Sequence, residues 1–88
     1  MKFRPITGDL SIEYPCRWLY KIFGTDQERM REALREILSG HDYTLFPSHS
    51  SRHGKYHCMN LDMTVSNEEE RTGIYETLRA HRAIILVL

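Results

Sequence analysis

The stretch KYHCMNLDMTV, residues 55–65, decides the fold because apolar and polar side chains alternate along it. Successive side chains of a β-strand point to opposite faces of the sheet, so this alternation predicts a strand with two different faces. Met59, Leu61, Met63 and Val65 point one way, and Tyr56, Cys58, Asn60, Asp62 and Thr64 point the other way. One apolar face and one mostly polar face are typical of an antiparallel sheet that helices cover on one side.

A helix is predicted upstream of this strand, between Thr25 and Gly40. Thr25 and Glu28 have the spacing of a capping box, and Gly40 is a natural C-terminal stop. Apolar residues recur at the spacing of one helical stripe, and charged residues take the opposite face. The stripe consists of Met30, Ala33, Leu34, Ile37 and Leu38.

Two further strands are predicted around that helix. Residues 17–23 are rich in aromatic and β-branched side chains, and Gly24 ends the run, which indicates a strand. Residues 43–46 form a short β-prone run that Pro47 interrupts. Because proline has no N–H to donate, this strand is predicted at an edge of the sheet. The polar residues 48–54 then connect it to the alternating strand.

A second helix and a last strand are predicted in the C-terminal part. The helix begins with a capping box formed either by Ser66 with Glu69 or by Asn67 with Glu70. Glutamates at its start are favourable because the helix dipole places partial positive charge there. Residues 83–88 are continuously apolar, which indicates a strand that pairs beside a central strand.

The order of these elements is strand, helix, strand, strand, helix, strand. With right-handed crossovers it predicts a ferredoxin-like βαββαβ sandwich of the α+β class. Its four-stranded antiparallel sheet has the first and third strands in the middle and both helices on one face. Residues 14–88 should form this single domain, and residues 1–13, which contain Pro5 and Gly8, are predicted to be a flexible N-terminal arm.

Length and charge restrict the functions that are open to the chain. Its 88 residues leave room for one thin hydrophobic core. Twelve basic residues balance twelve acidic ones, so there is no overall attraction for nucleic acid or an anionic membrane. Residues 83–88 are too few to cross a bilayer, and the N-terminus lacks the apolar stretch of a signal peptide. A cytoplasmic location is expected.

The residues with reactive side chains do not predict an active site. Cys16 and Cys58 should be free thiols near opposite ends of two antiparallel strands, too far apart for a disulfide. Cys58 follows His57 directly, and neighbours in a strand point to opposite faces, so they cannot act as nucleophile and base. The histidines at positions 49 and 53 are separated from His57 by Gly54 and should fan apart rather than bind a metal. We therefore expect no catalytic residue, metal or cofactor, and no enzyme.

Several short motifs occur along the chain from Tyr14 onward. They are Tyr14-Pro15, Trp18-x-Tyr20-Lys21-Ile22-x-Gly24, Ser50-Ser51-x-x-Gly54-Lys55-Tyr56-His57 and the closing Leu86-Val87-Leu88. Together they resemble the YbeD-like family of short bacterial proteins of unknown function. The resemblance implies a ferredoxin-like fold similar to the ACT regulatory domains, which sense small molecules, and it implies no known catalytic residue.

The leading hypothesis is a non-catalytic regulatory or interaction domain that binds a protein or a small ligand. It would use the open face of the sheet or the loop at residues 24–26, and an exposed mixed patch commonly marks such a site. Coverage of the same face by the N-terminal arm or by a second copy in a homodimer is the alternative. The candidate binding residues are Lys21, Phe23, Gly24, Lys55 and Tyr56.

An RNA-binding module is the second functional hypothesis. RNA-recognition motifs also have a ferredoxin-like sheet, and Gly54, Lys55 and Tyr56 open the third strand here in a similar way. Cys58 occupies the place where a second stacking aromatic would be wanted, and the net charge is zero. RNA binding is therefore less favoured than protein or ligand binding.

Overall fold

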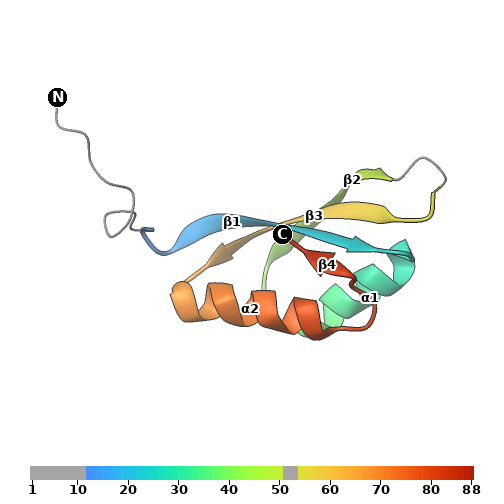
Figure 1. Cartoon of the computed structure of the whole chain (residues 1–88). Coiled ribbons are helices and arrows are strands. Elements are labelled where there is room, and N and C mark those ends of the chain that lie inside the picture. The colour runs from blue at the N-terminus through green and yellow to red at the C-terminus, as the bar shows by residue number, and fades with distance from the viewer. Residues whose placement is uncertain (1–11, 51–53) are drawn as a thin grey trace, which may run out of the picture.

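The computed structural model describes residues 12–50 and 54–88 and confirms the α+β fold (Figure 1). Two helices pack on one four-stranded antiparallel sheet, in the predicted order along the chain. The predicted N-terminal arm lies outside the described residues, apart from its last two positions. The elements are β1 (Cys16–Gly24), α1 (Gln27–Ile37), β2 (Tyr43–Ser50), β3 (His57–Val65), α2 (Glu68–Ala80) and β4 (Leu86–Val87).

The sheet has the strand order β2-β3-β1-β4, so β1 and β3 occupy the middle as predicted. They pair antiparallel along their whole lengths, from Cys16 opposite Val65 to Gly24 opposite His57. This register places Cys58 beside Phe23, far along the ladder from Cys16. Both cysteines are free thiols, which confirms the prediction that they form no disulfide.

Both helices cover the same face of the sheet, below it in Figure 1, and the core fills the layer between them. Alternation along β1 and β3 directs every second side chain into this layer. Half-buried Trp18 and Tyr43 pack against its margin. The buried core consists of Tyr20, Ile22, Met30, Leu34, Leu38, Met59, Leu61, Met63, Val65, Ile74, Leu78, Ile84 and Val87.

The helix α1 keeps its predicted apolar stripe, but it is capped differently. The prediction of Thr25 as the cap of α1 is wrong, because the Asp26 side chain accepts a hydrogen bond from the Arg29 amide and α1 begins at Gln27. An ionised carboxylate is a strong acceptor at this position. In α2 the second alternative holds, since Asn67 accepts from the Glu70 amide at 2.8 Å. The Glu70 carboxylate reaches back to the Ser66 amide at 2.7 Å.

All four strands differ in length from their predictions, and β1 differs least, with one more residue at each end. β2 continues past Pro47 to Ser50, because it is an edge strand and a missing N–H can face solvent there. Its register with β3 is irregular between Pro47 and His49. β3 begins at His57, two residues later than predicted. The continuous strand at residues 83–88 shrinks to Leu86–Val87. The Ile84 amide bonds instead to the His81 carbonyl, in a turn that closes α2.

We predict that Leu34→Ala lowers the free energy of unfolding by about 2–5 kcal/mol, because Leu34 is fully buried at the centre of the α1 stripe. Arg35→Ala, on the exposed face of the same helix, should change it by less than about 0.5 kcal/mol. Urea denaturation of both variants tests the orientation of α1. Equal losses of stability would contradict it.

Candidate functional site

The face of the sheet opposite the helices is the first candidate surface, and we call it the uncovered face. In Figure 1 both helices lie on the other side of the sheet. Residues that are opposite each other in neighbouring strands share a face, so the registers of the three strand pairs define its members. They are Arg17, Leu19, Lys21 and Phe23 of β1, Thr44 and Phe46 of β2, Cys58, Asn60, Asp62 and Thr64 of β3, and Leu86 of β4.

Large apolar side chains from three strands are exposed on the uncovered face. Leu19 is 49% exposed, Phe46 40% and Leu86 48%, and Phe23 between them is half-buried. Cys58 and Asn60, which also point to this face, are almost completely buried, because their strand partners Phe23 and Phe46 are much larger. Leu19 and Phe23 flank Lys21 on β1, and Phe46 lies beside Asn60, so apolar side chains surround a polar pair at the middle of the face.

The charged side chains of the uncovered face are engaged with neighbours on the same face. The Arg17 guanidinium donates two hydrogen bonds, of 3.0 and 2.7 Å, to the two carboxylate oxygens of Asp62. The Lys21 ammonium donates to the Asn60 amide oxygen at 3.0 Å. The Arg17–Asp62 pair is solvent-exposed and therefore contributes little to stability. The Asp62 carboxylate neutralises the positive charge of Arg17, which therefore attracts an incoming anionic ligand less.

The five residues predicted as a binding site differ in exposure and in the part of the sheet that they occupy. Lys21 and Phe23 lie on the uncovered face, as the alternation of β1 predicts. Lys55 and Tyr56 are exposed, and they precede β3 at the end of its ladder with β1. Gly24 is at the same end of that ladder, opposite His57, but it is buried.

Gly24 has a packing role. A Cβ atom at this position would lie 2.6 Å from the Ala83 carbonyl oxygen and 2.7 Å from the Met30 sulfur. The absence of a side chain therefore allows β1, α1 and the connection from α2 to β4 to approach closely. Because Asp26 caps α1, the loop at residues 24–26 is occupied by structural contacts.

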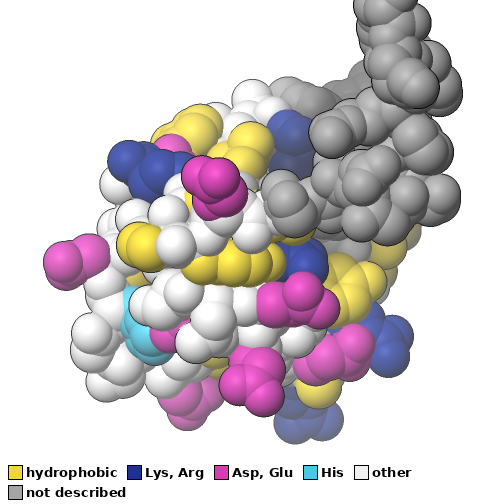
Figure 2. All heavy atoms as spheres, turned by 90° about the vertical axis from the view of Figure 1, so that its left-hand side faces the viewer, with side chains coloured by type: hydrophobic (Ala, Val, Ile, Leu, Met, Phe, Trp, Pro, Cys, Tyr) yellow, Lys and Arg dark blue, Asp and Glu magenta, His cyan; other side chains and the backbone are white. Residues whose placement is uncertain are grey.

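A second candidate surface, not predicted from the sequence, is a hollow between β1 and α2. We call it the aromatic pocket. It has a volume of about 410 Å³ and lies on the helix side of the sheet. Figure 2 looks at the end of the molecule where β1 and α2 begin, and it shows hydrophobic side chains between acidic ones. The pocket is lined by Trp18, Tyr20, Arg71, Thr72, Tyr75, Glu76 and Leu88.

Hydrogen bonds hold the walls of the aromatic pocket in place. The Tyr20 hydroxyl donates to the Arg71 carbonyl at 2.7 Å, which ties β1 to α2. The Arg71 guanidinium lies over the Trp18 ring, 4.6 Å from its centroid, and donates to the Tyr14 hydroxyl at 2.8 Å. Burial raises the pKa of Tyr20 to about 12, so its hydroxyl remains a donor at neutral pH.

Two sequence signals pointed toward this pocket. Trp18 and Tyr20 share a face of β1, and Arg71 and Tyr75 are one helical turn apart on α2. The contact between the two pairs depends on how α2 packs against the sheet.

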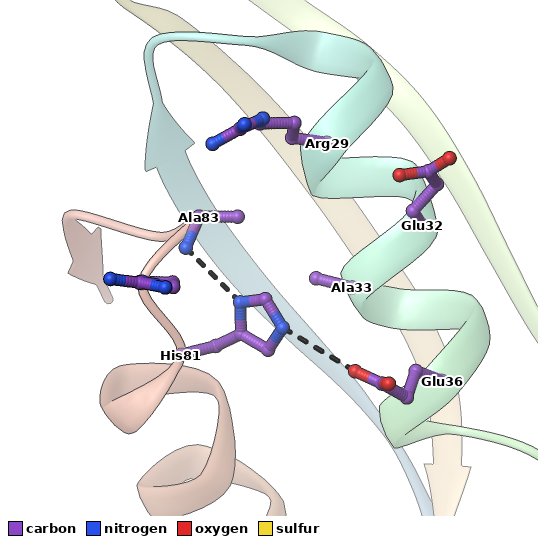
Figure 3. A pocket seen from close by; sticks show the side chains of 7 residues that line it. Arg29, Glu32, Ala33, Glu36, His81 and Ala83 are labelled. Carbon is purple, nitrogen blue, oxygen red and sulfur yellow. Dashed lines mark hydrogen bonds and ion pairs between the residues drawn. The ribbon is translucent and has the colours of Figure 1, made fainter.

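A third hollow, of about 370 Å³, lies between α1 and the connection from α2 to β4 (Figure 3). His81 lies at its edge and joins the two elements. Its Nδ1 accepts a hydrogen bond from the Ala83 amide at 3.1 Å, and its Nε2 lies 3.5 Å from a Glu36 carboxylate oxygen. Because both ring nitrogens have partners, we interpret His81 as a structural link.

The described residues give no sign of a reaction centre. In residues 12–50 and 54–88, no three side chains of His, Cys, Asp or Glu gather closely enough to hold a metal ion. None of the helices there has the length and apolar character needed to span a membrane. His57 contacts Gln27 through Nδ1 at 3.4 Å, while the adjacent Cys58 is buried on the uncovered face.

Comparison with known proteins identifies close relatives of unknown function. A family model described as "Protein of unknown function (DUF493)" matches residues 9–88. An uncharacterized protein of Campylobacter jejuni is 32% identical over 75 residues, which are 85% of this chain and 86% of the relative. A UPF0250 protein of Edwardsiella ictaluri is 29% identical over 88% of this chain and 91% of its own length.

A solved structure shares the fold. The solution structure of protein HP0495 from Helicobacter pylori superposes with a TM-score of 0.79 and 25% sequence identity. The match covers 100% of this chain and 98% of that protein. The arrangement of two helices on one face of the sheet is therefore also that of an experimentally determined relative.

We predict opposite effects for two glycine substitutions. Gly24→Ala should lower the free energy of unfolding by about 1–3 kcal/mol, because the added methyl overlaps the Ala83 carbonyl. Gly73→Ala should raise it by about 0.5–1 kcal/mol, since Gly73 lies in the exposed interior of α2 with nothing within 4 Å of its Cβ position. Thermal denaturation measures both. A Gly24→Ala variant as stable as the wild type would refute the packing role.

Alkaline pH should weaken the fold through Tyr20. The pKa of Tyr20 is raised from 10.0 to about 12, so its contribution to stability is complete below pH 10 and is lost as pH rises toward 12. We expect the unfolding free energy of wild type to decline over this range, and that of Tyr20→Phe to decline less. Urea denaturation at several pH values provides the measurement. Identical pH dependence of the two proteins would contradict the buried hydroxyl.

Proposed function

We propose that this chain, which belongs to the DUF493 family of proteins of unknown function, is a non-catalytic interaction domain that binds a partner protein through its uncovered face. The family membership agrees with the YbeD-like resemblance of the sequence motifs. Family and relatives alike are described as uncharacterised, so the argument for binding rests on the surface itself.

The observation that carries the proposal is the exposed apolar patch on the uncovered face. Leu19, Phe46 and Leu86 are each between two fifths and one half exposed, and they come from three different strands. An apolar patch of this kind, bordered by polar groups, is a frequent property of protein interfaces. The buried Cys58 and Asn60 beneath it provide a rigid base.

The polar groups of the same face favour a protein over RNA. Binding of RNA would need unpaired cations for phosphates and aromatic side chains on the central strands for base stacking. Arg17 is held by Asp62, and Lys21 by Asn60. β1 offers Phe23, but the position beside it on β3 is the small, buried Cys58. RNA binding is therefore the less supported alternative.

The ACT-like regulatory interpretation has weaker support in this structure. It would place a small ligand at the loop after β1, where Gly24 is buried against Ala83 and Met30. Asp26 in the same loop caps α1. A protein partner on the uncovered face is compatible with a regulatory role without using this loop.

Site-specific photocrosslinking tests the proposed face. A photoreactive phenylalanine analogue placed at position 46 in growing cells should yield a discrete adduct with one other protein. The same analogue at position 35, on the exposed side of α1, should not. Phe46 is partly exposed, so the replacement should cost less than about 1 kcal/mol of stability.

The nature of the adduct decides between the alternatives. A heterologous protein adduct from position 46, lost on Leu19→Ser and kept on Ile12→Ser, supports the proposal. Adducts only with a second copy of the chain, or only with RNA, would overturn it. Equal adducts from positions 46 and 35, or none from either, would also contradict a binding role for this face.

A further inference from the structure

In the part of the chain that the structure describes, the short last strand covers only part of β1. β4 pairs with β1 only at Ile22 and Phe23, and the backbone groups of Leu88 add two hydrogen bonds to Lys21. β1 begins at Cys16, and its pairing with β3 runs along its entire length. Among the described residues, residues 16–20 of β1 therefore have a strand on one side only. We call this stretch the β1 edge.

The β1 edge presents a definite set of backbone donors and acceptors. The N–H and C=O groups of Lys21 both point toward β4, at 3.0 and 2.8 Å from their partners on Leu88. In a strand, residues two apart direct these groups to the same side. The amides and carbonyls of Leu19 and Arg17 therefore point to the open edge. Only another extended main chain complements such a row fully.

The aromatic pocket lies directly beside this edge, on the helix side of the sheet. Trp18 and Tyr20 belong to the β1 edge itself, and Leu88, which bonds to Lys21, also lines the pocket. A strand added in line with β4 would direct every second side chain toward α2. The pocket of about 410 Å³ between β1 and α2 would receive one large apolar side chain of that strand.

The opposite edge of the sheet is less suited to the addition of a strand than the β1 edge. The outer strand there, β2, contains Pro47 and an irregular register with β3, and both features hinder the addition of another strand. The β1 edge contains neither a proline nor a bulge.

Charge favours a peptide from another protein over a second copy of this chain. Two-fold pairing of β1 with β1 would bring α2 against α2. The helix carries four glutamates and two arginines, a net charge of 4 − 2, or two negative charges. Repulsion between two such helices opposes the dimer, and the same charge attracts a basic peptide.

We propose that the β1 edge binds an extended peptide segment of a partner protein as an additional strand. The segment carries a large apolar side chain, which enters the aromatic pocket, flanked by Lys or Arg residues that face α2. Main-chain hydrogen bonds to Arg17 and Leu19 supply affinity, and the pocket supplies selectivity. This site is separate from the uncovered face and does not depend on its function.

Selection from a phage-displayed library of random peptides tests the proposal. Trp18 is the only tryptophan of the chain and lines the pocket, so its fluorescence reports occupancy during titration with the selected synthetic peptides. We expect basic peptides with a bulky apolar residue that change Trp18 emission. Amide hydrogen exchange at Arg17 and Leu19, fast in the free protein, should slow when such a peptide binds.

Matched variants separate the β1 edge from the uncovered face. Thr72→Arg fills the mouth of the pocket from an exposed position and should weaken peptide binding about tenfold or more. Leu19→Pro removes one edge N–H that the β1–β3 ladder does not use, and it should also weaken binding about tenfold. Leu19→Ala and Phe46→Ala should leave affinity within about twofold.

Several results would overturn the proposal. Failure of the library to yield any peptide that changes Trp18 emission would do so. Peptide affinity that is unchanged in Thr72→Arg would exclude the aromatic pocket as the binding site. This result would hold even if the Leu19→Pro variant does not fold. Loss of peptide binding on Phe46→Ala with Thr72→Arg unaffected would assign the peptide to the uncovered face. A preference for acidic peptides would contradict the proposed attraction between the negatively charged α2 and a basic peptide.

Discussion

The antiparallel pairing of β1 with β3 is the constraint on which the rest of this structure depends. Its register places Tyr20 opposite Leu61 in the core and Lys21 opposite Asn60 on the uncovered face. A slip by one residue would exchange the two faces of a strand and bury Lys21 under the helices. The helix contacts and both candidate surfaces therefore depend on this one ladder.

The two candidate surfaces arise from what the fold leaves without a partner. Two helices on one face cover only half of a four-stranded sheet, so the apolar residues Leu19, Phe46 and Leu86 remain exposed. A last strand of two residues cannot cover a nine-residue neighbour, so about half of β1 keeps an edge that no other described residues pair with. The His81 link and the buried Gly24 hold the intervening connection in place.

The parts of the fold that follow from local pattern could be predicted from the sequence. The stripe of α1 and the alternation of β3 identify the core, and alternation also places Lys21 and Phe23 on the uncovered face. The length of β4 could not be predicted, because residues 83–88 are uniformly apolar and a turn bond from Ile84 to His81 decides where the strand begins. The aromatic pocket was missed because it depends on how α2 packs against β1.

The burial of Cys58 and Asn60 also exceeds what alternation predicts. A period of two identifies the face of a side chain but not the size of its neighbours across the sheet. Phe23 and Phe46 become their neighbours only through strand pairing. Alternation alone therefore could not predict which side chains of the uncovered face are exposed, because this depends on the strand register.

Measurement of that register by nuclear magnetic resonance tests the account most directly. Lys21 and Asn60 form a pair whose backbone groups point away from each other, which brings their Cα atoms to about 4.5 Å. The account predicts a strong cross-strand signal between the Cα protons of Lys21 and Asn60, and another between those of Leu19 and Asp62. Strong signals from Tyr20 to Asn60 instead would show a register shifted by one residue and would contradict both the core and the binding surfaces described above.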